Sequence, residues 1–302
     1  MRPAWLDTQE YPFDSKYLEV EAGRMHYIDE GAGTPIVMLH GNPTWSFLYR
    51  KVVKKLSEHY RCIAIDLIGF GLSDKPDNWS YYPQEQVDNV EQLLAQLNLE
   101  DITLLVHDLG AAVGFAYAMK HPDKVKNIVL FNTWTWPLSR SASTDESGEK
   151  AEGPLSRFIH ARLHDTNTKL IHELFGNELT LPENILNQYI NGLGQPGQLV
   201  NTLPCTRSMP GTRKWLNELW QHRKIIQDIP ALILWGEEDN LVKAEALQKW
   251  KDFFHESYVI QFENSGHFLQ EHNADEVARY VDNFIKEEKK KHEASPHDFV
   301  KG

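Results

Sequence analysis

Short apolar runs alternate with amphipathic stretches along most of this chain, and the alternation restricts the fold more than any other feature. Apolar runs of strand length separated by helical periodicity are typical of a mostly parallel sheet with helices on both faces. We expect inner or parallel strands at 36–39, 62–65, 104–107, 128–131, 232–235 and 258–262. Helices are expected at 47–58, 83–97, 109–121, 244–254 and 274–288. A hairpin formed by 18–20 and 25–28 is expected at the edge of this α/β sheet.

The alternation breaks between residues 137 and 225. Helical patterns there cover 155–163, 168–175, 182–191 and 213–220, with no convincing strand. We interpret 137–225 as a helical cap inserted into a core of 1–136 and 226–290, followed by a disordered tail at 291–302. Such a cap excludes water and selects the substrate. The apolar cap residues that we expect near the pocket, with packing of the cap on the core as the alternative, are Phe158, Leu163, Leu174, Phe175 and Leu199.

Composition agrees with a soluble enzyme of this size. Hydrophobic residues make up 41% of the 302 positions, which allows a large core, and a net charge of −12 argues against binding to nucleic acid or an anionic membrane. No apolar run approaches the ~20 residues of a membrane-spanning helix, and the first ten residues lack the apolar stretch of a secretory signal. The two cysteines, Cys62 and Cys205, suggest reduced thiols, so we expect a cytoplasmic protein.

Few partners are indicated by the sequence. We expect no cofactor, and no metal site either, because His160, His164 and His172 lack a cysteine or carboxylate at ligand spacing. The expected partners are a small-molecule substrate and water, with the chain acting as a monomer or homodimer.

The segment 102–112 places an aspartate at a sharp turn between a strand and a helix. A short apolar run ends just before Asp108, and an apolar helical pattern begins at Leu109. This is the layout of a nucleophile elbow in which aspartate replaces the usual serine. A carboxylate in this position can displace a leaving group from carbon and form an ester with the substrate. The alternative role for Asp108 is a helix N-cap that accepts amide hydrogens.

Two further residues follow in the order that such a site requires. Asp239 lies in an acidic loop after the apolar strand 232–235, and His267 follows Ser265 and Gly266 after the next apolar stretch. The chain order is therefore nucleophile, acid and histidine. His267 is expected to activate a water as general base, while Asp239 holds the imidazole in the correct tautomer and stabilises its charged form.

A fourth candidate residue follows the strand at 36–39. Gly41, Asn42 and Pro43 require a sharp turn at the carboxyl end of that strand, where open α/β sheets bind their ligands. The main-chain amides of Asn42 and Leu109 would form an oxyanion hole for the intermediate produced when water attacks the aspartyl ester. The Asn42 side chain could also donate to a leaving group, and the alternative is a simple turn asparagine.

These segments carry a resemblance to a known family. The motifs at 40–46 and 66–76, the elbow at Asp108 and the motif at 266–271 resemble those of the haloalkane dehalogenases, which have an α/β-hydrolase fold. The resemblance spans nearly the whole catalytic domain and ends between about 137 and 225. It implies that Asp108 displaces a halide and that a water activated by His267 hydrolyses the alkyl ester. It also implies that Asp239 is the triad acid and that Asn42 is one of two halide-binding donors.

One position departs from the family pattern. The family has a tryptophan directly after the nucleophile as the second halide donor, whereas this chain has Leu109, which has no side-chain donor. Losing such a donor costs on the order of 3 kcal/mol of transition-state stabilisation, or roughly a hundredfold in rate. Trp134 and Trp136, at the end of the next strand, are candidate replacements, with aromatic packing as the alternative. Phe268 is a further pocket candidate because it adjoins His267.

Related enzymes leave other reactions open. Epoxide hydrolases share the aspartate but use two cap tyrosines, and residues 137–225 contain only Tyr189. Fluoroacetate dehalogenases carry an arginine where this chain has Leu109. The β-lactone decarboxylases of olefin synthesis and the coelenterazine luciferases also resemble this family and act without a halide. We therefore expect dehalogenase-like chemistry first, an epoxide, lactone or ester hydrolase second, and a non-catalytic binding module third.

Overall fold

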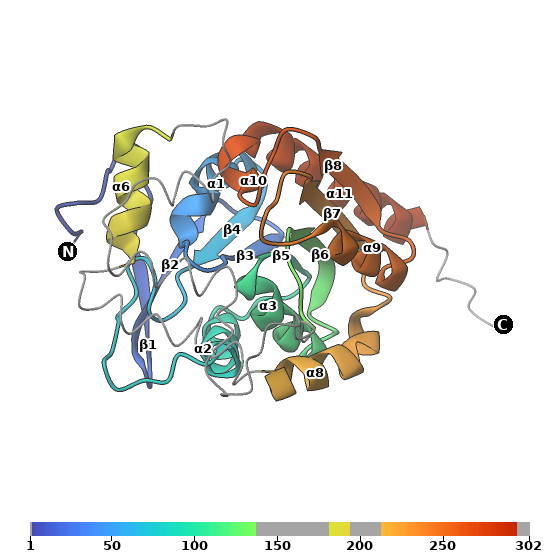
Figure 1. Ribbon diagram of the computed structural model, residues 1–302, viewed down its shortest axis with the longest axis horizontal. Coiled ribbons are helices and arrows are strands. Elements are labelled where there is room, and N and C mark those ends of the chain that lie inside the picture. Colours follow the sequence, from blue (N-terminus) through green and yellow to red (C-terminus); the bar gives the residue numbers. More distant parts are fainter. Residues whose placement is uncertain (1, 137–180, 194–212, 295–302) are drawn as a thin grey trace, which may run out of the picture.

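The parallel sheet predicted from the alternation forms the centre of the molecule (Figure 1). The computed structural model describes residues 2–136, 181–193 and 213–294. Within these residues one sheet has the strand order β1-β2-β4-β3-β5-β6-β7-β8. The hairpin of β1 (Lys16–Val20) and β2 (Gly23–Glu30) lies at one edge as expected, and β2 also pairs in the antiparallel sense with β4 (Arg61–Ile65).

The other strand pairs are all parallel, which confirms the expected inner strands. Their bounds are Pro35–Leu39 for β3, Ile102–His107 for β5, Val125–Phe131 for β6, Ala231–Gly236 for β7 and Tyr258–Phe262 for β8. Every residue of β5 and β7 is buried, so their continuous apolar sequences reflect coverage on both faces of the sheet.

Helices cover both faces of the sheet (Figure 1). In this view α1 (Arg50–Leu56), α10 (Leu269–His272) and α11 (Ala274–Ala294) lie above the sheet, whereas α2 (Pro83–Gln96) and α3 (Leu109–Lys120) lie below it. A 3-10 helix, η1 (Ser46–Tyr49), precedes α1 and occupies the start of the helix expected at 47–58. The helix α9 (Ala244–Phe253) follows β7 as expected.

The last helix is longer than the sequence indicates. We expected a helix at 274–288 and assigned 291–302 to a tail, but α11 continues to Ala294. Contacts near its end support this extension, because Lys291 Nζ donates to Glu288 Oε1 at 2.6 Å and to the Tyr258 hydroxyl at 2.9 Å.

Parts of the region between 137 and 225 are described, and they are helical. The helices α6 (Glu183–Gly192) and α8 (Arg213–His222) match those expected at 182–191 and 213–220, and a short 3-10 helix η2 (Arg223–Ile226) follows α8. The helices expected at 155–163 and 168–175 lie outside the described residues, and the division into core and cap stays a prediction. None of the described helices is both long and apolar enough to cross a membrane.

The strand register brings the carboxyl ends of the central strands to one edge of the sheet. Leu39 is level with Val106, His107 pairs with Phe131, and Phe131 pairs with Leu234. The loops that leave these strands therefore begin side by side. Open α/β sheets bind their ligands at this edge, so the candidate residues from distant parts of the sequence can meet there.

Candidate active site

Asp108 occupies a strained turn between β5 and α3. Its backbone has φ 47° and ψ −120°, a conformation that residues other than glycine rarely adopt. The Thr133 hydroxyl donates to the Asp108 carbonyl oxygen at 2.8 Å and helps to hold the turn. At Gly110 a Cβ atom would clash with the carbonyl oxygens of Leu39 and His40, so α3 can begin this close to β3 only with glycine there. The predicted elbow is therefore present in its geometry.

The loop after β3 presents a main-chain donor to the Asp108 carboxylate. The Asn42 amide donates to Asp108 Oδ1 at 2.9 Å, and a Leu109 amide hydrogen bond also favours the charged carboxylate. Gly41 permits this approach, because a Cβ atom there would clash with the Asp108 side chain. The two amides predicted to form the oxyanion hole thus both face Asp108.

His267 lies between two carboxylates. Its Nδ1 is 2.7 Å from Asp239 Oδ2, and its Nε2 is 3.9 Å from Asp108 Oδ2. All three side chains are nearly fully buried. Because a carboxylate only accepts hydrogen bonds, Nδ1 carries the proton towards Asp239, and the lone pair of Nε2 is directed to the side of Asp108. The structure therefore brings together the three residues that the sequence places 131 and 28 positions apart.

Asp239 is held by more partners than the sequence indicates. Its Oδ1 accepts the amides of Leu241 and Val242 at 2.7 and 3.0 Å, and Asn132 Nδ2 donates to its Oδ2 at 2.8 Å. Asn132 also bridges to Gly236, donating to its carbonyl oxygen and accepting from its amide. Asn132 follows the end of β6, so its position directly after an apolar strand is the signal that could have identified it.

Charges and burial shift the titration of the three residues in different directions. Burial raises the pKa of Asp108 above its usual value and outweighs the lowering effect of His267 and of the Leu109 and Asn42 amides. Burial would also raise the pKa of Asp239, but the charge and hydrogen bond of His267 hold it below its usual value. For His267 burial favours the neutral form, yet Asp239 and Asp108 raise its pKa above the ordinary value of 6.5.

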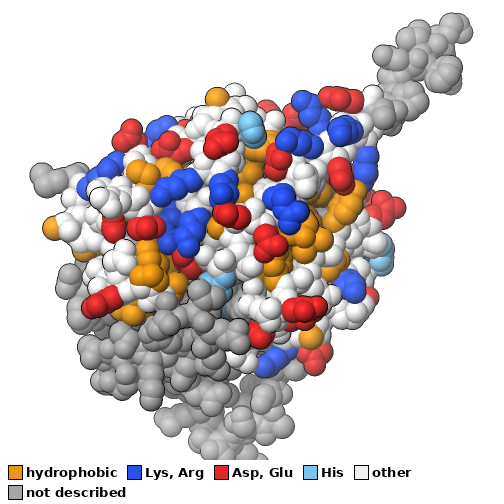
Figure 2. Space-filling model, turned by 90° about the horizontal axis from the view of Figure 1, so that it is seen from above, with side chains coloured by type: hydrophobic (Ala, Val, Ile, Leu, Met, Phe, Trp, Pro, Cys, Tyr) orange, Lys and Arg blue, Asp and Glu red, His pale blue; other side chains and the backbone are white. Residues whose placement is uncertain are grey.

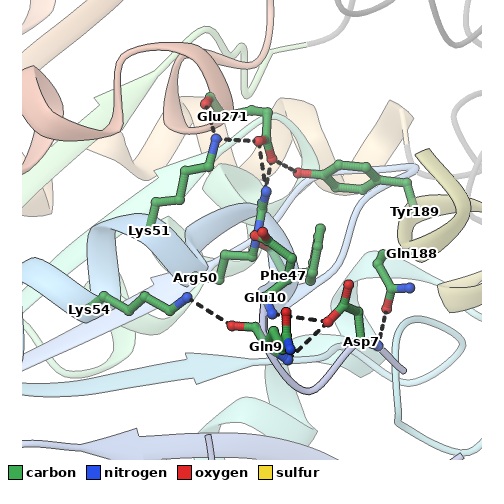
Figure 3. A network of polar contacts seen from close by, with 10 residues as sticks. All are labelled: Asp7, Gln9, Glu10, Phe47, Arg50, Lys51, Lys54, Gln188, Tyr189 and Glu271. Atoms are coloured by element: carbon green, nitrogen blue, oxygen red, sulfur yellow. Dashed lines mark hydrogen bonds and ion pairs between the residues drawn. The ribbon is translucent and has the colours of Figure 1, made fainter. Parts of the chain in front are cut away.

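A buried ion-pair network joins α10, which directly follows the His267 loop, to α1 and α6 (Figure 3). Arg50 donates to both carboxylate oxygens of Glu271, and Lys51 Nζ donates to Glu271 Oε1 at 2.8 Å. Tyr189 of α6 donates its hydroxyl hydrogen to Glu271 Oε2. Burial would raise the pKa of Glu271, but Arg50 and Lys51 lower it to about 2. Tyr189, the one tyrosine of residues 137–225, is therefore hydrogen-bonded to the Glu271 carboxylate.

The pocket candidates at the end of β6 differ in their surroundings. Trp136 packs its ring 4.8 Å from that of Trp220 and 5.1 Å from that of Trp250, with Lys249 Nζ 4.0 Å above it. These contacts agree with the packing alternative for Trp136. Trp134 is only partly buried, although the residues on either side of it are buried, and Leu109 shows the same pattern.

Phe268 is fully buried against histidine rings. Its ring centroid lies 4.9 Å from that of His267 and 5.5 Å from that of His107. It therefore supports the imidazole of His267 by direct contact, and its contact with substrate stays a prediction. The remaining pocket candidates lie outside the described residues, namely Phe158, Leu163, Leu174, Phe175 and Leu199.

A family model described as alpha/beta hydrolase fold matches residues 34–274. The chain belongs to the alpha/beta hydrolase fold family. This α/β-hydrolase is 31% identical to a cis-3-alkyl-4-alkyloxetan-2-one decarboxylase of Shewanella oneidensis, across 93% of this chain and 91% of that protein. It is 35% identical to a haloalkane dehalogenase of Mycolicibacterium paratuberculosis, across 78% of this chain and 79% of that one.

The solved structures similar to this α/β-hydrolase agree with the sequence relatives. The crystal structure of the haloalkane dehalogenase DatA from Agrobacterium tumefaciens matches with a TM-score of 0.75 at 25% identity, covering 91% of this chain and 97% of that chain. The resemblance carried by the motifs is confirmed, and the protein is an enzyme of the haloalkane dehalogenase-like class of hydrolases.

Proposed function

We propose that this enzyme cleaves a carbon–halogen bond of a small apolar or moderately polar substrate through a covalent ester on Asp108. The observation that carries the proposal is the placement of the Asp108 carboxylate. One oxygen accepts the Asn42 amide, and the other faces His267 Nε2 at 3.9 Å. A buried carboxylate held in this way has few hydrogen bonds to break before it attacks carbon.

In the first step an oxygen of Asp108 attacks the carbon that bears the halogen. The new carbon–oxygen bond forms as the carbon–halogen bond breaks, and the halide leaves with the electron pair. The Asn42 side chain would donate to the departing halide. No proton is transferred in this step, so it requires Asp108 to be ionised and does not require His267 to act as a base.

In the second step water hydrolyses the ester. His267 Nε2 removes a proton from the water, which attacks the ester carbonyl carbon, and the amides of Asn42 and Leu109 stabilise the oxyanion. Asp239 stabilises the imidazolium that forms. As the intermediate collapses, the bond to the alkoxide breaks and the His267 imidazolium gives its proton to the departing alkoxide, which leaves as the alcohol. The new carboxyl group then loses its proton to solvent, which restores the Asp108 carboxylate and neutral His267.

A strained cyclic ester is a second candidate substrate, and two observations favour it. Leu109 provides no side-chain donor for a departing halide. The oxetan-2-one decarboxylase of Shewanella oneidensis also matches nearly the full length of this chain. When a carboxylate opens a β-lactone at its alkyl carbon, the leaving group remains tethered to the substrate, and relief of ring strain lowers the need for a halide-type site.

Trapping the covalent intermediate tests this function. The variant His267→Phe is incubated with 1-bromohexane, styrene oxide or a cis-3,4-dialkyl β-lactone, and the intact protein is weighed by mass spectrometry. Halide displacement adds only the hexyl group, whereas ring opening adds the whole molecule, so the mass identifies the reaction. The double variant Asp108→Asn, His267→Phe is the matched control and should gain no mass. Absence of an adduct with every electrophile would contradict the covalent ester on Asp108.

The same proposal includes the setting in which the enzyme works. We place it in the cytoplasm, acting on a small molecule and water as a monomer or homodimer. The buried free thiol of Cys62 supports a reducing compartment. The face shown in Figure 2 intersperses basic and acidic side chains, which suits a small-molecule enzyme better than a nucleic-acid-binding protein.

A further inference from the structure

His107 contacts the main chain of His267. It is the last residue of β5, directly before Asp108, and its side chain is fully buried. Its Nε2 lies 2.9 Å from the His267 carbonyl oxygen, and the two imidazole rings are 4.5 Å apart between centroids.

The hydrogen bond determines the tautomer of His107. A carbonyl oxygen can only accept, so Nε2 must carry the hydrogen. Its Nδ1 has no hydrogen-bond partner among the described residues. Burial, followed by the charge of His267, lowers the pKa of His107 well below its usual value, so the ring stays neutral while His267 takes up a proton.

An apolar side chain would fill the same space without burying an unpaired nitrogen, which is costly. The donor to His267 is therefore the contact that requires a histidine. Asp239 fixes the Nδ1 side of the His267 ring and Phe268 packs against the ring, but neither contact holds the main chain from which the ring extends. The bond from His107 fixes the main chain from which the ring extends.

We propose that His107 is a positioning residue for the hydrolytic step, because its Nε2–H holds the His267 main chain at the spacing from Asp108 that admits an attacking water. This inference rests on the proposed function. The first step needs only the Asp108 carboxylate and should depend little on His107. The second step needs His267 within hydrogen-bonding reach of a water, and a misplacement of about 1 Å in a reacting group can cost ~100-fold in rate.

Two variants distinguish the effect of the hydrogen-bond donor of His107 from the effect of its side-chain volume. His107→Gln places an amide N–H at a reach similar to that of Nε2, whereas His107→Phe fills the space without a donor. In rapid-quench measurements with 1-bromohexane, we expect His107→Phe to slow ester hydrolysis by ~100-fold and to accumulate the hexyl adduct, because alkylation continues. We expect His107→Gln to recover most of the hydrolysis rate.

A buried histidine outside the site provides the matched control. His26 is also fully buried and bonds to Asp66 at 2.8 Å, so His26→Gln should destabilise the fold without changing the ratio of the two rates. Equal slowing of both steps in His107→Phe, or equal hydrolysis rates in the Phe and Gln variants, would overturn the proposal.

A substrate-free measurement keeps this inference distinct from the proposed function. In nitrogen-15 spectra of the parent enzyme, His107 should give the signal of an Nε2–H tautomer, and this signal should be missing from the spectra of both His107 variants. The low-field proton shared by His267 and Asp239 should shift in His107→Phe and be retained in His107→Gln. If His107 instead carries its proton on Nδ1, or if the shared proton is unchanged in His107→Phe, the inference fails even where the trapping experiment succeeds. If trapping fails but these signals behave as expected, the proposed function and the hydrolytic role of His107 are lost, and only its hold on the His267 main chain stands.

Discussion

His267 Nε2 lies 3.9 Å from Asp108 Oδ2, although the other ring nitrogen lies only 2.7 Å from Asp239. The imidazole is thus hydrogen-bonded to one carboxylate and separated from the other by more than a direct hydrogen bond. The two carboxyl groups also differ in pKa. Burial raises the pKa of Asp108, whereas the contacts of Asp239 lower its pKa. This asymmetry suits one carboxylate to attack carbon and the other to orient and stabilise the histidine.

Replacement of Asp239 by Asn should slow ester hydrolysis strongly. The amide cannot accept from Nδ1 with a full negative charge, and the wrong histidine tautomer is favoured, which in comparable triads costs ~10⁴-fold. We expect the covalent adduct to accumulate, because the first step does not use the histidine as a base. Stopped-flow kinetics with intact-protein mass spectrometry would measure this. The exposed carboxylate of Asp252, which accepts from Gln248, supplies the control variant Asp252→Asn, expected to behave like the parent.

The two steps should differ in their dependence on pH. Hydrolysis needs neutral His267, so its rate should fall as the pH decreases through the pKa of this histidine. Burial lowers that pKa, whereas Asp239 and Asp108 raise it above 6.5 in the free enzyme, and esterification removes the contribution of the Asp108 charge. Alkylation needs ionised Asp108, so its acid limb follows the raised pKa of that carboxyl. In His267→Phe the charge that lowers the pKa of Asp108 is lost, and the alkylation limb should move further towards neutral pH. A hydrolysis rate that does not fall with decreasing pH would contradict this assignment.

Introducing the missing donor should favour halide release. Leu109→Trp places an indole N–H directly after the nucleophile, and a donor of this type contributes on the order of 3 kcal/mol, or up to roughly a hundredfold in rate. Bromide release from 1,2-dibromoethane measured with a halide electrode would test this, with Leu109→Phe as an aromatic control that lacks the donor. An unchanged rate in the tryptophan variant would mean that another group, such as Trp134, already donates to the halide.

Local chemistry explains which parts of the site could be predicted from the sequence. Asp108, Asp239, His267 and Asn42 each follow an apolar strand directly or within a short loop, so strand signals and turn residues identify them without knowledge of the strand order. Asn132 also directly follows an apolar strand, but its bond to Asp239 depends on β6 lying beside β7 in the sheet. No pattern within a short window of sequence indicates that pairing.

The length of an element decides whether it could be predicted from the sequence. Strands and long helices have enough residues to show periodicity, and they were predicted to within a few positions. The helix α10 has only four residues and was missed, since one turn is too short to give a helical pattern. Its position depends instead on the bond between Arg50 and Glu271, which are 221 residues apart in the sequence.

The buried network around Glu271 should contribute strongly to stability. Glu271→Gln removes the buried carboxylate that Arg50 contacts and leaves it only the partly exposed carboxylate of Glu10, so the loss should reach up to about 3 kcal/mol of unfolding free energy. Urea denaturation at neutral pH would measure the loss. For comparison, Asp88→Asn removes an exposed contact with Lys120 and should cost less than about 1 kcal/mol.

The same variant should show the pH range over which the network acts. The pKa of Glu271 is about 2 in the folded enzyme against an ordinary value of 4.5. A lowered carboxyl pKa contributes stability that is complete above the unfolded pKa and is lost as the pH falls through the folded pKa. The difference in unfolding free energy between the parent and Glu271→Gln should therefore be constant above pH 4.5 and shrink towards pH 2. A difference that stays the same at pH 3 and pH 7 would show that the charge of Glu271 does not stabilise the fold.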